Sequence, residues 1–145
     1  MNNINDIMKN WEIDSVVDRT DPGNELLKIP QLHSKYLDAL IRFKRASKKI
    51  EFKLIKLKKL KNEYYSGKIS DEDLRINNWE PFQLKILKTD INTYVDSDSE
   101  IINLIAEKFE FDECVSAIEL IMNELKSRTF QLRDFIAYEK FISGA

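Results

Sequence analysis

The chain has 145 residues, of which 43% are hydrophobic and 33% charged, and its formal net charge is −2. This composition is too apolar for a disordered chain, and only three glycines and three prolines argue against a turn-rich all-β fold. One cysteine excludes an internal disulfide and fits a reducing compartment. No basic-then-apolar leader opens the sequence and no apolar run could span a bilayer, so we expect a soluble protein that is not secreted.

Residues 1–29 are predicted to form an N-terminal arm. A short helix is expected over residues 2–11, and an extended lead-in over residues 12–30. Residues 21–24 (DPGN) are typical of a turn, because proline presets the first central position and glycine tolerates a positive φ. The arm is expected to lie along the main body or to reach a neighbouring subunit.

A long helix is predicted from Pro30 to Tyr65, because proline is tolerated in a first helical turn and neither glycine nor proline follows it in this range. Intervals of three and four residues, typical of a coiled coil, separate its apolar residues. These are Leu32, Tyr36, Leu40, Phe43, Ala46, Ile50, Leu54, Leu57, Leu60 and Tyr64. A helix this long with one apolar stripe needs a helical partner.

Positive charge is concentrated between Arg42 and Lys68, where eleven residues are basic and only two are acidic. Tyr64 and Tyr65 lie where the helix should end, and lysines beside aromatic rings are typical of proteins that bind single-stranded nucleic acid. Other interpretations stay open at this point. Residues 96–124, with nine acids and one base, could neutralise the basic helix, or that helix could meet a membrane surface or an acidic protein groove.

The second half of the chain also favours helices. After a connector over residues 66–78, residues 79–81 (WEP) are predicted to reopen a helix, and Ser97 or Ser99 to cap another that runs to residue 142, with or without a bend near Phe111 or Arg128. The predicted fold is all-α: a long antiparallel α-hairpin over residues 30–127 and an oligomerisation helix over residues 128–145. The candidate oligomerisation residues are Phe130, Leu132, Phe135, Ile136, Phe141 and Ile142.

No pattern of catalytic, metal-binding or cofactor-binding residues emerges from the sequence. His33 and Cys114 each fall in a helical pattern, and the three glycines are too far apart for a phosphate-binding loop. Residues 96–100 (DSDSE) lack the glycine and the distal glutamate of a calcium-binding loop, so helix capping explains them better. We therefore predict a protein that is not an enzyme and has no cofactor and no metal site.

Three stretches carry a resemblance to a known family: LHSKYL at residues 32–37, YYSGK at 64–68 and LKSRTFQLR at 125–133. In this order and at similar separations they resemble the UvsY family, the recombination mediator proteins of T-even-like tailed phages, over residues 28–145. The resemblance implies a ring-like homo-oligomer of six or seven subunits that binds single-stranded DNA. It also implies that the protein loads a RecA-like phage recombinase onto strands coated by the phage single-strand-binding protein, in the cytoplasm of the infected bacterial host.

The family's DNA-binding motif, Leu-Lys-Ala-Arg-Leu before the tyrosine pair, aligns its two basic positions with Lys59 and Lys61. The chain departs from the motif at its other positions, where it has Lys58, Leu60 and Asn62. Tyr65 lies off the apolar stripe and is the candidate for base stacking. The predicted DNA-binding residues are Arg45, Lys48, Lys49, Lys53, Lys56, Lys58, Lys59, Lys61, Tyr65 and Lys68. The alternative function is an oligomeric helical scaffold, or a protein-interaction module, without DNA binding.

Overall fold

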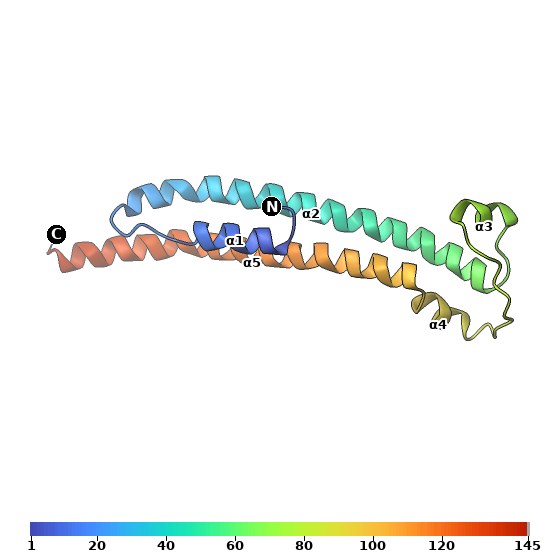
Figure 1. Ribbon diagram of the computed structural model, residues 1–145. Coiled ribbons are helices and arrows are strands. Elements are labelled where there is room, and N and C mark those ends of the chain that lie inside the picture. The colour runs from blue at the N-terminus through green and yellow to red at the C-terminus, as the bar shows by residue number, and fades with distance from the viewer. Residues whose placement is uncertain (145) are drawn as a thin grey trace. The chain divides into compact units, whose positions relative to one another are not determined.

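The computed structural model describes residues 1–144 and is built of helices, with no strand among these residues. The all-α prediction is confirmed. The helices are α1 (Ile4–Asp14), α2 (Pro22–Tyr65), α3 (Asp71–Asn77), α4 (Ile91–Asp96) and α5 (Ser99–Ile142), as Figure 1 shows. None of them is long and apolar enough to cross a membrane.

The chain forms two compact units, which we describe separately. The first unit comprises residues 1–46 and 110–145, and the second comprises residues 47–109. The long helices α2 and α5 each contribute one part to each unit. The first unit therefore holds α1, the start of α2 and most of α5, whereas the second holds the end of α2, the short helices α3 and α4, and the start of α5.

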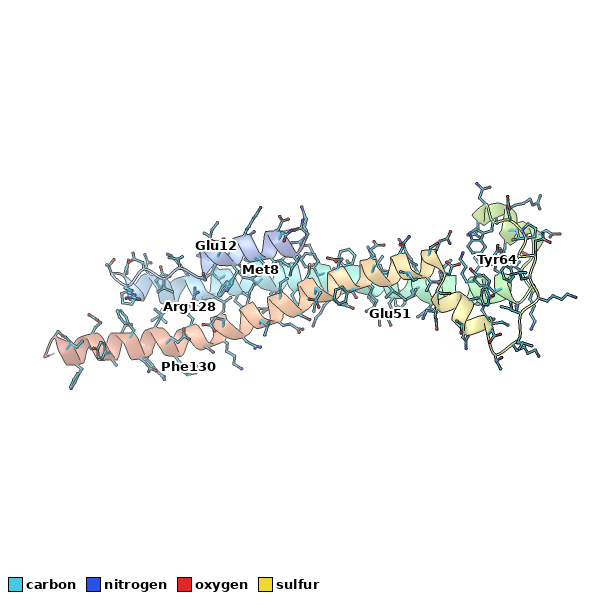
Figure 2. The ribbon with its side chains drawn as sticks, turned by 60° about the horizontal axis from the view of Figure 1, so that its bottom comes forward. Met8, Glu12, Glu51, Tyr64, Arg128 and Phe130 are labelled. Atoms are coloured by element: carbon cyan, nitrogen blue, oxygen red, sulfur yellow. The ribbon has the colours of Figure 1, made fainter. Side chains whose placement is uncertain are left out.

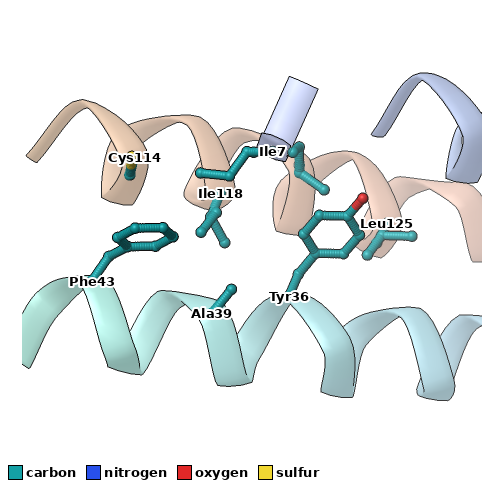
Figure 3. Packing of buried hydrophobic residues seen from close by; sticks show 8 residues of the cluster. Ile7, Tyr36, Ala39, Phe43, Cys114, Ile118 and Leu125 are labelled. Carbon is teal, nitrogen blue, oxygen red and sulfur yellow. The ribbon is translucent and has the colours of Figure 1, made fainter. Parts of the chain in front are cut away.

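The first unit is organised around an apolar core. Figure 3 shows Tyr36, Ala39 and Phe43 of α2 facing α5, with Ile7 of α1 covering the space between the two helices. The α5 residues of this core are Cys114, Ile118, Ile121 and Leu125. Full burial of each large side chain contributes roughly 1.5–3 kcal/mol, so this core is the main source of the unit's stability.

Helix α2 begins at Pro22, so the predicted start at Pro30 and the predicted extended stretch over residues 12–30 are wrong. Asp21 takes the capping role, because its carboxylate accepts from the Asn24 N–H at 3.3 Å and its carbonyl accepts from the Glu25 N–H at 3.2 Å. Pro22 then occupies the first turn, where a missing N–H costs nothing, and Pro30 lies inside the helix.

Residues 79–90 are not the predicted helix but an irregular stretch with a turn at its end, and helix resumes only in α4. Asn78 ends α3 in the left-handed conformation, with φ of 60°. The hydroxyl of Tyr64 then donates to the Glu80 carbonyl at 2.7 Å, and the Phe82 ring packs 5.7 Å from the Tyr64 ring between centroids. These contacts with the end of α2 hold the stretch in a non-helical conformation, although its sequence pattern favours a helix.

Helix α5 has no break near Phe111 or Arg128, so residues 128–142 continue it rather than forming a separate helix. Its first turn is capped by Asp98, not by Ser97 or Ser99 as predicted. The Asp98 carboxylate accepts from the Glu100 N–H at 2.9 Å, and its carbonyl accepts from the Ile102 N–H, also at 2.9 Å. The Ser97 hydroxyl donates back to the Thr93 carbonyl at the end of α4.

Candidate nucleic-acid interface

The second unit presents a row of lysines along α2. Lys49, Lys53, Lys56 and Lys59 are exposed, and their spacing places them within about one third of the helix circumference. None of the four makes an ion pair with a residue in the described range 1–144. We call these four residues the basic face. A row of lysines without acidic partners is a suitable contact for a phosphate backbone.

Phe52 lies beside the basic face and was missed by sequence reasoning. Its side chain is 54% exposed, and the Lys48 ammonium lies 5.6 Å from the centroid of its ring. An exposed aromatic ring among lysines can stack a base while the lysines hold phosphates. The signal was present in the sequence, because Phe52 is the one aromatic residue of Lys48–Leu60 and lies off the apolar stripe.

The other predicted basic residues lie near the basic face or apart from it. Arg45 is exposed on the part of α2 that belongs to the first unit. Lys48 is exposed but pairs with Glu51 at 2.9 Å, and Lys58 lies 4.0 Å from Asp96 of α4. Lys68 is exposed just after the end of α2. The acidic segment thus pairs with a few lysines of this helix but makes no ion pair with the basic face within residues 1–144.

Lys61 does not belong to the basic face, since it is only 5% exposed. Its ammonium donates to Asp98 at 3.0 Å and lies 3.3 Å from Glu100, and it is 3.9 Å from the centroid of the Trp79 ring. Residues two positions apart on a helix point in nearly opposite directions, so Lys59 and Lys61 cannot face one strand together. The structure separates the two lysines that the family motif places together.

Tyr65 is half-buried in the same cluster rather than freely exposed. Its hydroxyl donates to Asp98 at 2.7 Å, and its ring lies 4.9 Å from Phe82 and 5.5 Å from Tyr94 between centroids. Burial, followed by the bond to Asp98, raises the pKa of the Tyr65 hydroxyl. Burial also acts to raise the pKa of Asp98, but the bonds from Tyr65 and Lys61 outweigh it, so that the pKa is lowered.

The candidate oligomerisation residues of α5 are divided between core and surface. Leu132 is buried with 5% exposure, and Phe135 and Ile136 are half-buried. Phe130, Phe141 and Ile142 are exposed, as is Tyr138, which sequence reasoning missed; Figure 2 labels Phe130 on this part of α5. Of the six candidates, only Phe130, Phe141 and Ile142 are therefore exposed in the described chain.

The remaining sequence candidates for chemistry do not come together. His33 is exposed on α2, whereas Cys114 is buried in the core of the first unit. Burial, with the charges of Glu110 and Glu113, raises the pKa of the Cys114 thiol and keeps it protonated. Within residues 1–144 no group of three or more histidine, cysteine, aspartate or glutamate side chains is placed to hold a metal ion.

Comparison with protein families gives a match that covers nearly the whole chain. Residues 10–145 match the family described as "Recombination, repair and ssDNA binding protein UvsY". The chain belongs to the UvsY family. It is thereby a member of a family of recombination, repair and single-stranded-DNA-binding proteins, and the sequence-based recognition is confirmed.

Solved structures support the same assignment at the level of the fold. The UvsY-family chain matches the crystal structure of the bacteriophage T4 recombination mediator protein UvsY in lattice type II with a TM-score of 0.85 and 20% identity, over 97% of each chain. The lattice type I structure of the T4 protein matches with a TM-score of 0.83 and 20% identity, over 94% of this chain and 98% of that one. A search of curated proteins returned no match.

Proposed function

We propose that this protein is a recombination mediator that binds single-stranded DNA through the basic face of α2. It loads a RecA-like recombinase onto strands that are coated by a single-strand-binding protein. The observation that carries the proposal is the set of four exposed lysines without acidic partners, in a chain whose net charge is −2. Membership of a family of recombination and single-stranded-DNA-binding proteins supports it.

The strand contacts the basic face mainly through its phosphates. Lys49, Lys53, Lys56 and Lys59 hold the backbone, with Lys48 as a flanking contact, and Phe52 stacks a base. Binding then weakens linearly with the logarithm of salt concentration, by about 0.7 per phosphate contact on a single strand. Lys61 and Tyr65 act in this proposal by holding the end of α2 in place, because both are engaged with Asp98.

The DNA-binding test is a salt titration of oligonucleotide binding. The double variant Lys56→Ala/Lys59→Ala should weaken binding to all sequences alike and lower the salt slope by about 1.4, for two lost contacts. The matched control is Lys9→Ala/Lys126→Ala, which removes two exposed lysines of the first unit and should leave the slope unchanged. A folded test variant with the wild-type slope would place the DNA site elsewhere.

The functional form in this proposal is a ring-like homo-oligomer of six or seven subunits. Phe141 is 82% exposed and Ile142 60%, and Phe130 and Tyr138 of the same helix α5 are exposed as well. Exposure of this much apolar and aromatic surface on a lone subunit is unfavourable. A closed symmetric assembly buries such a surface on every subunit. It also repeats the basic face, so that many weak phosphate contacts act together and supply the free energy that displaces the coating protein.

The mediator function is tested by measuring ATP hydrolysis by the recombinase of the same phage. The DNA strands are coated with the single-strand-binding protein of that phage, in a buffer with the salt and pH of the bacterial cytoplasm, where the protein is proposed to act. Addition of the wild-type protein should lower the recombinase concentration needed for hydrolysis. Phe141→Ser/Ile142→Ser should give smaller species in ultracentrifugation and lose this stimulation. The control Ile13→Ser, at an exposed residue of α1, should keep the wild-type size and stimulation. Stimulation by neither the wild type nor the control would favour the scaffold alternative.

A further inference from the structure

A cavity of about 790 Å³ lies at the end of α2 in the second unit. Lys68, Lys85 and Lys88 line it, and no acidic residue does. The hollow on the other side of Asn62 differs, because Glu63 and Asp96 accompany its lysines Lys58 and Lys59. The three lysines of the cavity make no ion pair with any residue from 1 to 144. The cavity therefore carries uncompensated positive charge.

The chain brings these lysines together from two separate segments. After α2 ends, Gly67 adopts a φ of +76°, and the backbone N–H of Lys68 donates to the Glu63 carbonyl at 2.9 Å. The irregular stretch 79–90 returns to the same place and supplies Lys85 and Lys88. Its position is fixed by the Phe82 ring, which packs 4.9 Å from Tyr65 and 5.8 Å from Tyr94 between centroids. Figure 2 labels Tyr64 at this end of α2.

The cavity also has an apolar wall beside its lysines. Tyr65, Phe82, Leu84 and Ile86 line it, and Leu84 is 63% exposed. Lysines around a wall of aromatic and aliphatic side chains suit a ligand with phosphates on one side and a flat, weakly polar ring on the other. A nucleotide within a single strand has both, whereas an acidic peptide would use the lysines and leave the apolar wall exposed.

The cavity is continuous with the basic face. Asn62 lines both this cavity and the hollow that contains Lys59. Lys59 is the last lysine of the basic face, so a strand that follows α2 reaches Asn62 next and then the cavity. The volume lies within the range of ordinary small-ligand sites, about 300–1,000 Å³. A site of this size holds part of a strand rather than a whole folded partner.

We propose that this cavity is a second single-stranded-DNA contact, in which Lys68, Lys85 and Lys88 hold phosphates and Phe82 and Leu84 pack against a base. The inference rests on the proposed function, since it assumes that the strand runs along the basic face. It assigns a DNA-binding role to the irregular stretch 79–90. Three further phosphate contacts raise the salt slope of the wild type by about 2.

The test compares Lys85→Ala/Lys88→Ala with wild type and with the control Lys9→Ala/Lys126→Ala, using oligothymidylate at several salt concentrations. Both substitutions lie on exposed positions of an irregular stretch, so circular dichroism should be unchanged. We expect weaker binding and a salt slope lower by about 1.4, for two contacts, with no change in the control. An oligonucleotide with photoreactive 5-iodouracil should also cross-link to the tryptic peptide of residues 76–85, which contains Phe82 and Leu84.

The outcomes separate this inference from the function on which it rests. If the wild type binds and Lys56→Ala/Lys59→Ala weakens binding, but Lys85→Ala/Lys88→Ala keeps the wild-type slope and no cross-link forms in residues 76–85, the cavity is not a DNA contact. The proposed function then stands. If the wild type does not bind single-stranded DNA at any salt concentration, both proposals fail.

Discussion

The two units are stabilised in different ways. Among the buried residues described in the first unit, only Glu25 and Arg128 are charged, and all the others except Leu132 belong to its apolar core. The second unit buries fewer residues, and half of them are polar or charged: Ser47, Lys61 and Asp98, beside Ile50, Val95 and Ile101. Its end is closed by a cluster of aromatic rings around Tyr64, Tyr65 and Phe82.

Each unit nevertheless contains the same polar arrangement. In the first, Asp14 accepts from the Lys35 ammonium at 2.6 Å and from the Tyr36 hydroxyl at 2.9 Å. In the second, Asp98 accepts from Lys61 and Tyr65 in the same way. The first arrangement ties α1 to an apolar core that is stable for other reasons. The second caps α5 and holds the aromatic cluster, so we infer that the second unit depends more strongly on its buried charges.

The largest expected effect is therefore the loss of Lys61. Lys61→Met leaves Asp98 buried without its cation, and breaking a buried ion pair from one side typically costs about 3–5 kcal/mol. The free energy of unfolding, measured in denaturant at one protein concentration, should fall by this order. Adding Asp98→Asn should recover much of the loss, because asparagine is neutral and still caps a helix. The exposed Lys59→Met is the control, with a change within about 0.5 kcal/mol.

The same experiment shows whether Lys61 stabilises the fold or contacts the DNA strand. A variant with unchanged stability, and with DNA affinity reduced as much as in Lys59→Met, would show that Lys61 reaches the strand. The buried ion pair would then not form in solution.

The next effect tests the apolar core of the first unit. Ile118 of α5 is fully buried in the core that α5 forms with α2. Ile118→Ala shortens this side chain and leaves a cavity, which typically lowers the free energy of unfolding by about 2–5 kcal/mol. Leu120, two residues along α5, is 71% exposed. Leu120→Ala is the matched control and should change stability by less than about 0.5 kcal/mol. Equal losses in the two variants would mean that α5 packs with a different face inward.

Much of this fold follows from the spacing of apolar residues. Tyr36, Phe43 and Ile50 lie on the predicted stripe and are buried. The same spacing also places Lys61 on the buried side of the helix, because Lys61 follows Leu54 by seven residues and Leu57 by four, which are intervals of the stripe. The predicted stripe has Leu60 there, and the burial of Lys61 depends on its partner Asp98, which is distant in the sequence.

The errors concern helix starts and the path between helices. Pro22 and Pro30 carry the same signal for a helix start, and the local capping bonds of Asp21 select the first. Ser97, Asp98 and Ser99 are equivalent caps by sequence, and only the contacts of Asp98 with Lys61 and Tyr65 select it. The cavity beside α2 could not be foreseen, because it requires the irregular path of residues 79–90.

The smallest expected effect is on the pH dependence of the free energy of unfolding, to which one tyrosine of each unit contributes. Burial, followed by a hydrogen bond to a carboxylate, raises the pKa of both Tyr36 and Tyr65 above the unfolded value of about 10. Their contribution to stability is therefore complete below pH 10 and is lost as the pH rises toward the folded pKa, because only the unfolded chain then loses these protons. Each tyrosine contributes at most about 1.4 kcal/mol per pH unit to this decline.

The measurement is the free energy of unfolding between pH 9 and 11 for wild type, Tyr36→Phe and Tyr65→Phe. The difference curve between wild type and each variant cancels the lysine titrations that the proteins share, and it should shrink toward zero as the pH rises above 10. Ile118→Val is the control, since it lowers stability by about 0.5–1.5 kcal/mol without removing a titrating group, so its difference curve should stay flat. A flat curve for Tyr65→Phe but not for Tyr36→Phe would mean that the second unit opens near Asp98 while the core of the first remains closed.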